Sequence, residues 1–242
     1  IQEKKTLYIP KRFVAASRHF LGFPIPASND FPINMALVQK YFNVTDDASK
    51  ADIALVCIEN PKSGIGYDKE DVAKGGNGYL PISLQYTDYT ANDAREVSIA
   101  GGDPLENFTN RSYKGKTVKS RNVTDIQLIE ETKAKMNGKP VIVSVNVSNP
   151  MVFAEFEGKA DAILASFGVQ DQAILEILAG KAEPQALLPM QMPANMSVVE
   201  KQKEDVPFDM ECHVDSEGHR YDFGFGMNWK GVIQDGRTKA FK

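Results

Sequence analysis

Short apolar runs alternate along this chain with segments whose apolar residues recur at helical spacing. Four runs are apolar at almost every position, which is typical of strands buried on both faces of a sheet: 6–9, 53–58, 140–147 and 160–167. Three segments place their apolar residues on one helical face: 35–42, 123–137 and 171–179. This strand–helix order predicts an α/β fold with a mostly parallel sheet between helices.

Residues that commonly cap or end helices occur at the ends of the predicted helices. Asn34 is placed to cap the first helix, and either Asn122 or Thr124 is placed to cap the second. Gly138 and Gly180 follow the second and third helices, where glycine commonly ends a helix. These signals set the helix boundaries to within a residue or two.

Two long loops interrupt the alternation. One covers residues 60–80 and is rich in glycine, and the other covers residues 101–122 and is polar. Long loops within a compact domain are commonly functional. Ligands of open α/β sheets bind beyond the carboxyl ends of the strands, and both loops leave or approach a strand end. We therefore expect the binding surface there.

Composition narrows the class of protein. Lys and Arg total 28 against 32 Asp and Glu, and a net charge of −4 disfavours general binding to nucleic acid. The apolar runs are too short for a transmembrane helix, and the first residues show no signal peptide, so the chain reads as a piece of something longer. Cys57 and Cys212 form no disulfide framework, although a bond between them stays open. No spacing of metal ligands and no phosphate-binding glycine motif occurs, so no cofactor is expected.

Three stretches of the second half carry a family resemblance. They are Lys-Pro-Val-Ile-Val-Ser-Val-Asn at 139–146, Asp-Ala-Ile through a helix to Leu-Pro-Met-Gln-Met-Pro at 161–193, and Tyr-Asp-Phe-Gly-Phe-Gly-Met-Asn-Trp at 221–229. In this order and spacing they resemble the C-terminal domain of family-3 glycoside hydrolases of the β-glucosidase type. Gly66-Tyr67-Asp68 also has a counterpart in the family, and the resemblance covers nearly the whole chain.

The resemblance implies a single α/β sandwich with a mostly parallel sheet of about six strands. In complete members this domain packs on a (β/α)₈ barrel that supplies the nucleophilic Asp, which follows a Ser. No Ser-Asp pair occurs in this sequence, and no stretch is left for eight βα units. We therefore expect residues 1–242 to be the sandwich, with the barrel absent from this chain and the isolated chain inactive.

The catalytic candidates are carboxylates near the first long loop. Retaining glycosidases need two carboxyl groups about 5–5.5 Å apart. The family commonly places its acid/base just before Gly-Tyr-Asp, but Ile65 and Ser63 occupy the expected sites here, so that role does not transfer residue by residue. Glu59 at the strand end and Glu70 on the loop remain as acid/base candidates. The alternatives are that both are solvated loop charges, or that the barrel supplies the acid.

The same loop holds the candidate sugar contacts. Tyr67 and Tyr79 could stack on a sugar ring, and Asp68 and Asn77 are the polar candidates for substrate binding. The glycines at 75–78 would let the backbone approach a ligand closely, or simply make a flexible turn. Because glycine-rich segments lose much entropy on ordering, we expect the loop to be mobile in the isolated chain.

The sequence leaves two main hypotheses for the function, which belong to different classes, and a third that it disfavours. The first is one wall of the sugar pocket of a β-glucosidase-like enzyme that acts on β-linked gluco-oligosaccharides or glucosides together with its barrel. The alternative is a non-catalytic carbohydrate-binding or interdomain scaffold module. An unrelated flavodoxin-like binding protein is the third reading, and the absence of a phosphate-binding glycine loop speaks against it. The resemblance implies a periplasmic or secreted parent protein, with no membrane or nucleic-acid partner.

Overall fold

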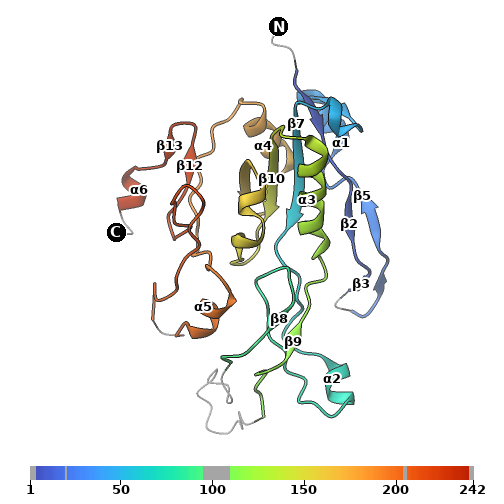
Figure 1. Ribbon diagram of the computed structural model, residues 1–242, viewed down its shortest axis with the longest axis vertical. Helices are drawn as coiled ribbons and strands as arrows, with labels where there is room; N and C mark the ends of the chain where they lie inside the picture. The colour runs from blue at the N-terminus through green and yellow to red at the C-terminus, as the bar shows by residue number, and fades with distance from the viewer. Residues whose placement is uncertain (1–3, 20, 95–109, 204–205, 240–242) are drawn as a thin grey trace.

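The computed structural model describes residues 4–19, 21–94, 110–203 and 206–239 (Figure 1). Its centre is a sheet of five parallel strands in the spatial order β11-β10-β7-β1-β6. The strands are β1 (Thr6–Tyr8), β6 (Asn43–Thr45), β7 (Ile53–Glu59), β10 (Val141–Asn146) and β11 (Ala162–Ser166). Taken in chain order this is the arrangement 2-1-3-4-5 of doubly wound folds, with its switch point between β1 and β7.

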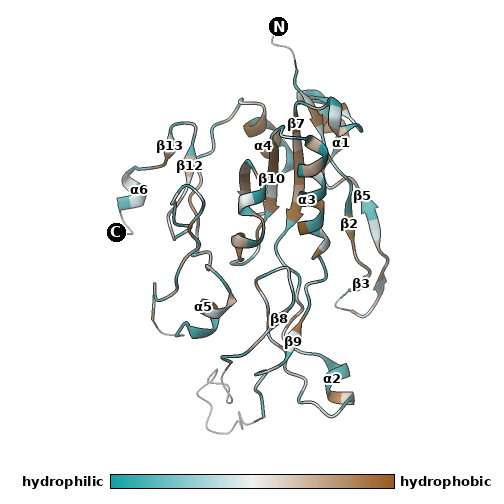
Figure 2. Cartoon of the chain, in the orientation of Figure 1, coloured by the Kyte–Doolittle hydropathy of each residue, from teal (hydrophilic) through white to brown (hydrophobic). Residues whose placement is uncertain are grey.

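Helices cover both faces of the sheet. On one face, α3 (Thr124–Met136) packs on a core that includes Val56 of β7 and Val143 of β10. On the other, α1 (Met35–Tyr41) and α4 (Asp171–Leu178) pack on Leu55 of the same strand. Because successive strand residues point to opposite faces and both faces are covered, β7 is apolar at almost every position (Figure 2).

The boundaries of α1, α3 and α4 agree with those predicted from the sequence, but the N-cap of α3 differs from the prediction. Asn34 accepts a hydrogen bond from Leu37 N at 3.2 Å and caps α1 as expected. The N-cap position of α3 is Val123, which makes no side-chain cap bond, so neither Asn122 nor Thr124 caps that helix. The amide of Asn122 instead donates to Asp125 Oδ2 at 2.9 Å, because that carboxylate belongs to a buried cluster described below.

Three parts project from the sheet (Figure 1). Near β1 lie two antiparallel pairs, β2 (Arg12–Val14) with β5 (Ser28–Asp30) and β3 (Ser17–Arg18) with β4 (Pro24–Ile25). Beyond the carboxyl end of β7 lies a lobe with α2 (Lys69–Ala73), β8 (Tyr89–Thr90) and β9 (Thr117–Val118). The C-terminal part holds α5 (Met196–Lys201), β12 (Met227–Asn228), β13 (Gly231–Val232) and α6 (Gly236–Lys239). The described residues also form three short 3-10 helices: Ala48–Lys50, Phe153–Glu155 and Glu157–Lys159.

The sheet has one strand fewer than the six that the resemblance implied. The segment 187–193, which the family resemblance implies is a strand, does not join the sheet in the part of the chain that the structure describes. Its backbone bonds instead to the C-terminal segment, with Leu188 N donating to Phe225 O at 2.7 Å and Met192 N to Tyr221 O at 2.9 Å. Cys57 and Cys212 are both free thiols. Of the second long loop, residues 101–109 lie outside the described residues.

Candidate functional site

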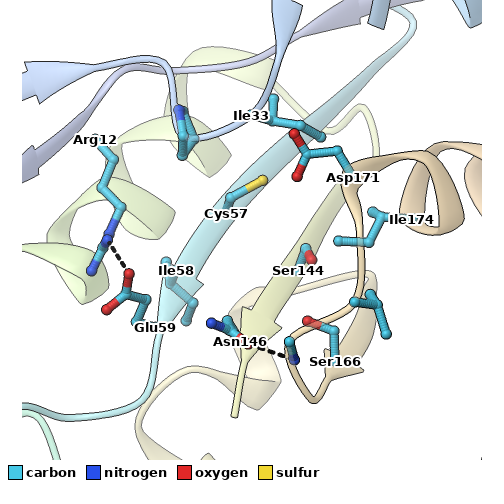
Figure 3. A pocket seen from close by; sticks show the side chains of 13 residues that line it. Arg12, Ile33, Cys57, Ile58, Glu59, Ser144, Asn146, Ser166, Asp171 and Ile174 are labelled. Atoms are coloured by element: carbon cyan, nitrogen blue, oxygen red, sulfur yellow. Dashed lines mark hydrogen bonds and ion pairs between the residues drawn. The ribbon is translucent and has the colours of Figure 1, made fainter. Parts of the chain in front are cut away.

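A cavity of about 220 Å³ opens at the carboxyl ends of β7, β10 and β11 (Figure 3). We call it the strand-end cavity. Its walls come from the last residues of these three strands, from the first turn of α4, and from the segment before α1. This edge of the sheet is where ligands bind in doubly wound folds, so the topology of the fold selects the place.

A buried ion pair anchors one side of the strand-end cavity. Arg12, the first residue of β2, contacts the carboxylate of Asp125 on α3 with Nε–Oδ1 at 2.8 Å and Nη2–Oδ2 at 2.9 Å. The side chains of Arg12 and Asp125 are 9% and 1% exposed. Burial by itself lowers the pKa of Arg12, but hydrogen bonding and charge from Asp125, with the charge of Glu59, raise it above its ordinary value. The guanidinium therefore stays charged and fixed in direction.

Glu59 is the last residue of β7, and its carboxylate faces two cations, Arg12 and Lys62. Its Oε1 lies 3.2 Å from Arg12 Nη1 (Figure 3), and its Oε2 lies 3.3 Å from Lys62 Nζ. The Glu59 side chain is 39% exposed, so solvent or a ligand can reach it. A carboxylate that is open on one side and held by two cations on the other is suited to accept hydrogen bonds from a bound molecule.

The backbone of Glu59 is held from several sides. Its N–H donates to Asp125 Oδ2 at 3.4 Å, and its carbonyl accepts from Asn122 Nδ2 at 3.2 Å and from the hydroxyl of Tyr86. Asn60, the next residue, is buried and donates to Asn149 Oδ1 at 2.6 Å. The strand end is therefore a rigid platform, built from α3, from β7 and from the segment after β10.

Glu70, the other acid/base candidate, has different surroundings. It lies in the first turn of α2, its side chain is 82% exposed, and its carboxylate is 4.0 Å from Lys74 Nζ one turn later. Asp68 caps the same helix by accepting from Glu70 N at 2.8 Å. Both side chains thus serve the short helix, and neither lines the strand-end cavity.

The aromatic candidates do meet. Tyr67 and Tyr79 pair across an antiparallel bridge, with ring centroids 5.7 Å apart and planes at 85°. Between them in sequence, Gly78 has φ +83°, and a Cβ there would lie 2.5 Å from the Tyr67 ring. Asn77 donates to Ser112 O at 2.7 Å and also accepts from the ammonium of Lys116. The glycine-rich segment is therefore a packed turn in the lobe around α2.

An ion pair that the sequence did not indicate ties this lobe together. Lys116 Nζ lies 2.7 Å from Asp71 Oδ2, which also accepts from Gly78 N at 2.7 Å. These hydrogen bonds, from Lys116 first and then from Gly78, lower the pKa of Asp71. Loop 60–80 thus contains a helix and an internal network, and its mobility in solution stays a prediction.

Cys57 lines the strand-end cavity but is a poor nucleophile. Burial, with the charge of Asp171, raises the pKa of its thiol to about 12, although Arg12 acts in the opposite direction. Thiolate is the reactive form of cysteine, so little of it is present at neutral pH. Among the described residues, no group of three or more His, Cys, Asp or Glu side chains could hold a metal ion. Within the same ranges, no helix has the length and apolar character needed to cross a membrane.

Sequence reasoning found Glu59 but missed the residues that hold it. Arg12 follows a short strand within a polar-looking segment, and Asp125 looks like an ordinary acidic residue in the first turn of a helix. They are 113 positions apart, so only the fold brings them together. One feature of the sequence could have indicated this pair. Asp125 lies on the same helical face as Ile129, which is buried, and a charged side chain on a buried face needs a partner of opposite charge.

Comparison with known proteins agrees with this architecture. The glycosyl hydrolase family 3 C-terminal domain matches residues 34–229. The β-glucosidase C of Emericella nidulans is 38% identical over 84 residues, or 35% of this chain, and a probable β-glucosidase C of Aspergillus oryzae is 39% identical over 101 residues, or 42% of it. A periplasmic β-glucosidase/β-xylosidase of Dickeya chrysanthemi is 31% identical over 120 residues, or 50% of this chain.

These matches cover only small parts of the relatives. The aligned segments span 14%, 15% and 17% of the lengths of the three relatives, in the order given above. A solved β-glucosidase involved in saponin metabolism from intestinal bacteria aligns with 90% of this chain and 26% of its own, at a TM-score of 0.41 and 16% identity. The family match over 34–229 includes the four sheet strands β6, β7, β10 and β11 and the three covering helices α1, α3 and α4, and leaves out only β1 of the sheet. The chain therefore belongs to glycosyl hydrolase family 3, as the C-terminal domain of that family.

Proposed function

We propose that this domain forms one wall of the sugar pocket of a β-glucosidase-type retaining glycoside hydrolase, with Glu59 as its acid/base candidate. Glu59 is the observation that carries the proposal. Its backbone is fixed by Asp125, Asn122 and Tyr86, while its carboxylate is 39% exposed at the carboxyl end of a central strand. A catalytic carboxylate has to be both fixed in place and within reach of the substrate.

Glu59 is the stronger of the two acid/base candidates. Glu70 extends into solvent from a helix of five residues, and an exposed pair four residues apart such as Glu70–Lys74 restrains a side chain only weakly. We propose that the nucleophile comes from a barrel domain outside this chain, which also supplies most contacts to a β-linked glucoside or gluco-oligosaccharide. The names of the relatives favour a β-glucoside substrate, and one relative that is called periplasmic favours a periplasmic parent protein.

The ion pairs of Glu59 favour a second candidate function. Each oxygen of the Glu59 carboxylate already contacts a cation, Arg12 at 3.2 Å and Lys62 at 3.3 Å, whereas a general acid has to present an oxygen to the leaving group. A non-catalytic carbohydrate-binding or interdomain scaffold module would use Glu59 only to accept hydrogen bonds from sugar hydroxyls. The two functions differ in whether the reaction depends on a proton from Glu59.

The test uses the intact enzyme that contains this domain. Glu59→Gln and the matched control Glu70→Gln are compared on aryl β-glucosides with good and poor leaving groups. If Glu59 is the acid, Glu59→Gln slows glucosides with poor leaving groups far more than those with good ones, because only poor leaving groups need protonation. Glu70→Gln should leave both rates unchanged. Small effects of Glu59→Gln that are equal for all leaving groups would favour the scaffold function.

The isolated chain should show no β-glucosidase turnover. Without the nucleophile, the remaining groups can supply only a small part of the catalysis, since members of a catalytic set act as a unit. The measurement is release of nitrophenol from an aryl β-glucoside at high protein concentration, beside a preparation from cells that lack the chain. Turnover that purifies with the chain and disappears in Glu59→Gln would contradict the need for a barrel.

A further inference from the structure

A two-stranded arm follows β1 and extends at the edge of the molecule beside α3 (Figure 1). It consists of residues 12–31, with β2 paired to β5 at its base and β3 paired to β4 near its tip. We call it the ribbon arm. Arg12 anchors its base to Asp125, but none of the described residues from 13 to 31 is buried. Since an isolated two-stranded ribbon is only marginally stable in water, the ribbon arm needs a partner surface.

The ribbon arm exposes a large apolar surface. Six large apolar side chains are between 41% and 64% exposed: Phe13, Val14, Leu21, Phe23, Ile25 and Phe31. At roughly 200 Å² for a side chain of this size, the exposed fractions correspond to about 600 Å². An apolar patch of about that size on a soluble protein marks a contact surface.

The ribbon arm has to be enclosed on both of its faces. Phe13 and Val14 are neighbours on β2, so their side chains point to opposite faces of the ribbon, and both are exposed. A mutual exchange of arms between two copies of the chain encloses both faces, because each arm then lies between the partner's arm and the partner's body. The two arms together would bury about 1,200 Å² of apolar surface, which reaches the lower limit for specific protein interfaces.

The charges of the ribbon arm suit contact with a copy of itself. Arg18 lies near the tip, opposite Pro24 in the β3–β4 pair, and Asp30 lies at the base, opposite Arg12 in the β2–β5 pair. Both side chains are exposed, and within the described ranges neither has an ion-pair partner. In a two-fold contact, each surface meets the same surface of the other copy. Two arms that cross tip to base therefore bring Arg18 of each copy to Asp30 of the other.

We propose that two copies of this chain form a dimer by exchanging ribbon arms, with Arg18 of each copy paired to Asp30 of the other. The inference depends on the exposure and charge of the ribbon arm alone. It therefore neither rests on the proposed role of Glu59 nor affects it.

Sedimentation equilibrium of the full chain over a range of concentrations measures the dimer. The wild type should show a monomer–dimer equilibrium. Phe23→Glu should weaken association about tenfold or more, because the dimer would bury an unpaired charge at a side chain that is 64% exposed in one copy. Ile65→Glu is the matched control, since Ile65 is 87% exposed but lies outside the ribbon arm, and it should leave the dimer unchanged. Circular dichroism checks that each variant is folded.

Charge reversal tests the tip-to-base crossing. Arg18→Glu alone and Asp30→Arg alone should each be monomeric, because each variant places like charges opposite one another at both contacts. An equimolar mixture of the two variants should form a heterodimer, since both contacts then join opposite charges. Effects of either change on the folding of one chain cannot produce this recovery, because it requires two different chains.

The inference is overturned if the wild type stays monomeric at every concentration, or if Ile65→Glu dissociates the dimer and Phe23→Glu does not. A mixture of the two charge variants that stays monomeric would refute the pairing of Arg18 with Asp30. A monomeric wild type whose amides at 13–31 become protected from hydrogen exchange only in the intact parent protein would also overturn it, because another domain of that protein would then cover the ribbon arm.

Discussion

Replacing Asp125 by Asn tests whether the Arg12–Asp125 pair holds the strand-end platform. The change keeps the shape of the side chain but removes its charge. Arg12 then keeps a guanidinium that is 9% exposed, without its bidentate partner at 2.8 and 2.9 Å. Because Arg cannot release its proton at ordinary pH, the cost cannot be avoided by neutralisation.

The expected size follows from burial. Breaking a buried ion pair by removing one partner typically costs about 3–5 kcal/mol. Glu59, 3.2 Å from Arg12 Nη1, compensates part of the charge, so we expect the lower end, about 3 kcal/mol. For a domain of this size that corresponds to a fall in Tm of about 6–12 °C. Glu59→Gln, at a side chain 39% exposed, should cost no more than about 1 kcal/mol.

Urea denaturation followed by circular dichroism measures both variants against the wild type. The double variant Arg12→Met/Asp125→Leu is the decisive control, because replacing a buried pair by apolar side chains is often nearly neutral. It should recover most of the stability that Asp125→Asn loses. If Asp125→Asn costs no more than Glu59→Gln, the pair is not the anchor of the platform. If the double variant is as unstable as Asp125→Asn, lost packing and not an uncompensated charge explains the effect.

Three further changes test other parts of the structure. Burial lowers the pKa of His213 against the charges of nearby carboxylates, so its contribution to stability is fully present above its unfolded value of 6.5 and is lost as pH falls through the folded pKa. Urea denaturation at pH about 7.5 and about 5.5 should show a smaller loss in His213→Gln than in the wild type, and an equal loss would contradict the assignment. Gly78→Ala should destabilise the chain more than the control Gly75→Ala, since both have positive φ but only at Gly78 would a Cβ meet the Tyr67 ring; equal thermal shifts would rule out the contact. Leu55→Ala, at 0% exposure in the central strand, should cost about 2–5 kcal/mol by the same urea assay, and a cost below about 1 kcal/mol would contradict its place in the core.

Much of the fold could be read from the sequence because local pattern and burial agree along the core elements. The run 53–58 became β7, and 171–179 became α4, each within a residue. The missing sixth strand shows the limit of this reasoning. An apolar segment with prolines, such as 187–193, is extended whether it joins the sheet edge or pairs with the C-terminal segment. Which of the two partners it pairs with depends on contacts between residues far apart in the sequence.

The candidate site was predictable in position but not in composition. A glutamate directly after a buried strand indicates the carboxyl edge of the sheet, which is where Glu59 lies. Asp68 and Asn77 could not be judged in the same way, since short polar side chains near glycines serve equally well as caps or as ligand contacts. In the structure the first caps α2 and the second contacts Ser112 and Lys116.

The class of fold, the family and the strand end that carries Glu59 could all be inferred before the structure, because they depend on the order of elements and on motifs contiguous in the chain. The meeting of Arg12 and Asp125 beneath Glu59, and the position of Asp171 in the wall of the same cavity, became evident only in the folded chain. Contacts between residues far apart in sequence follow from strand order and helix packing, which no local pattern encodes. The chemistry of this strand end is therefore a property of the folded sheet.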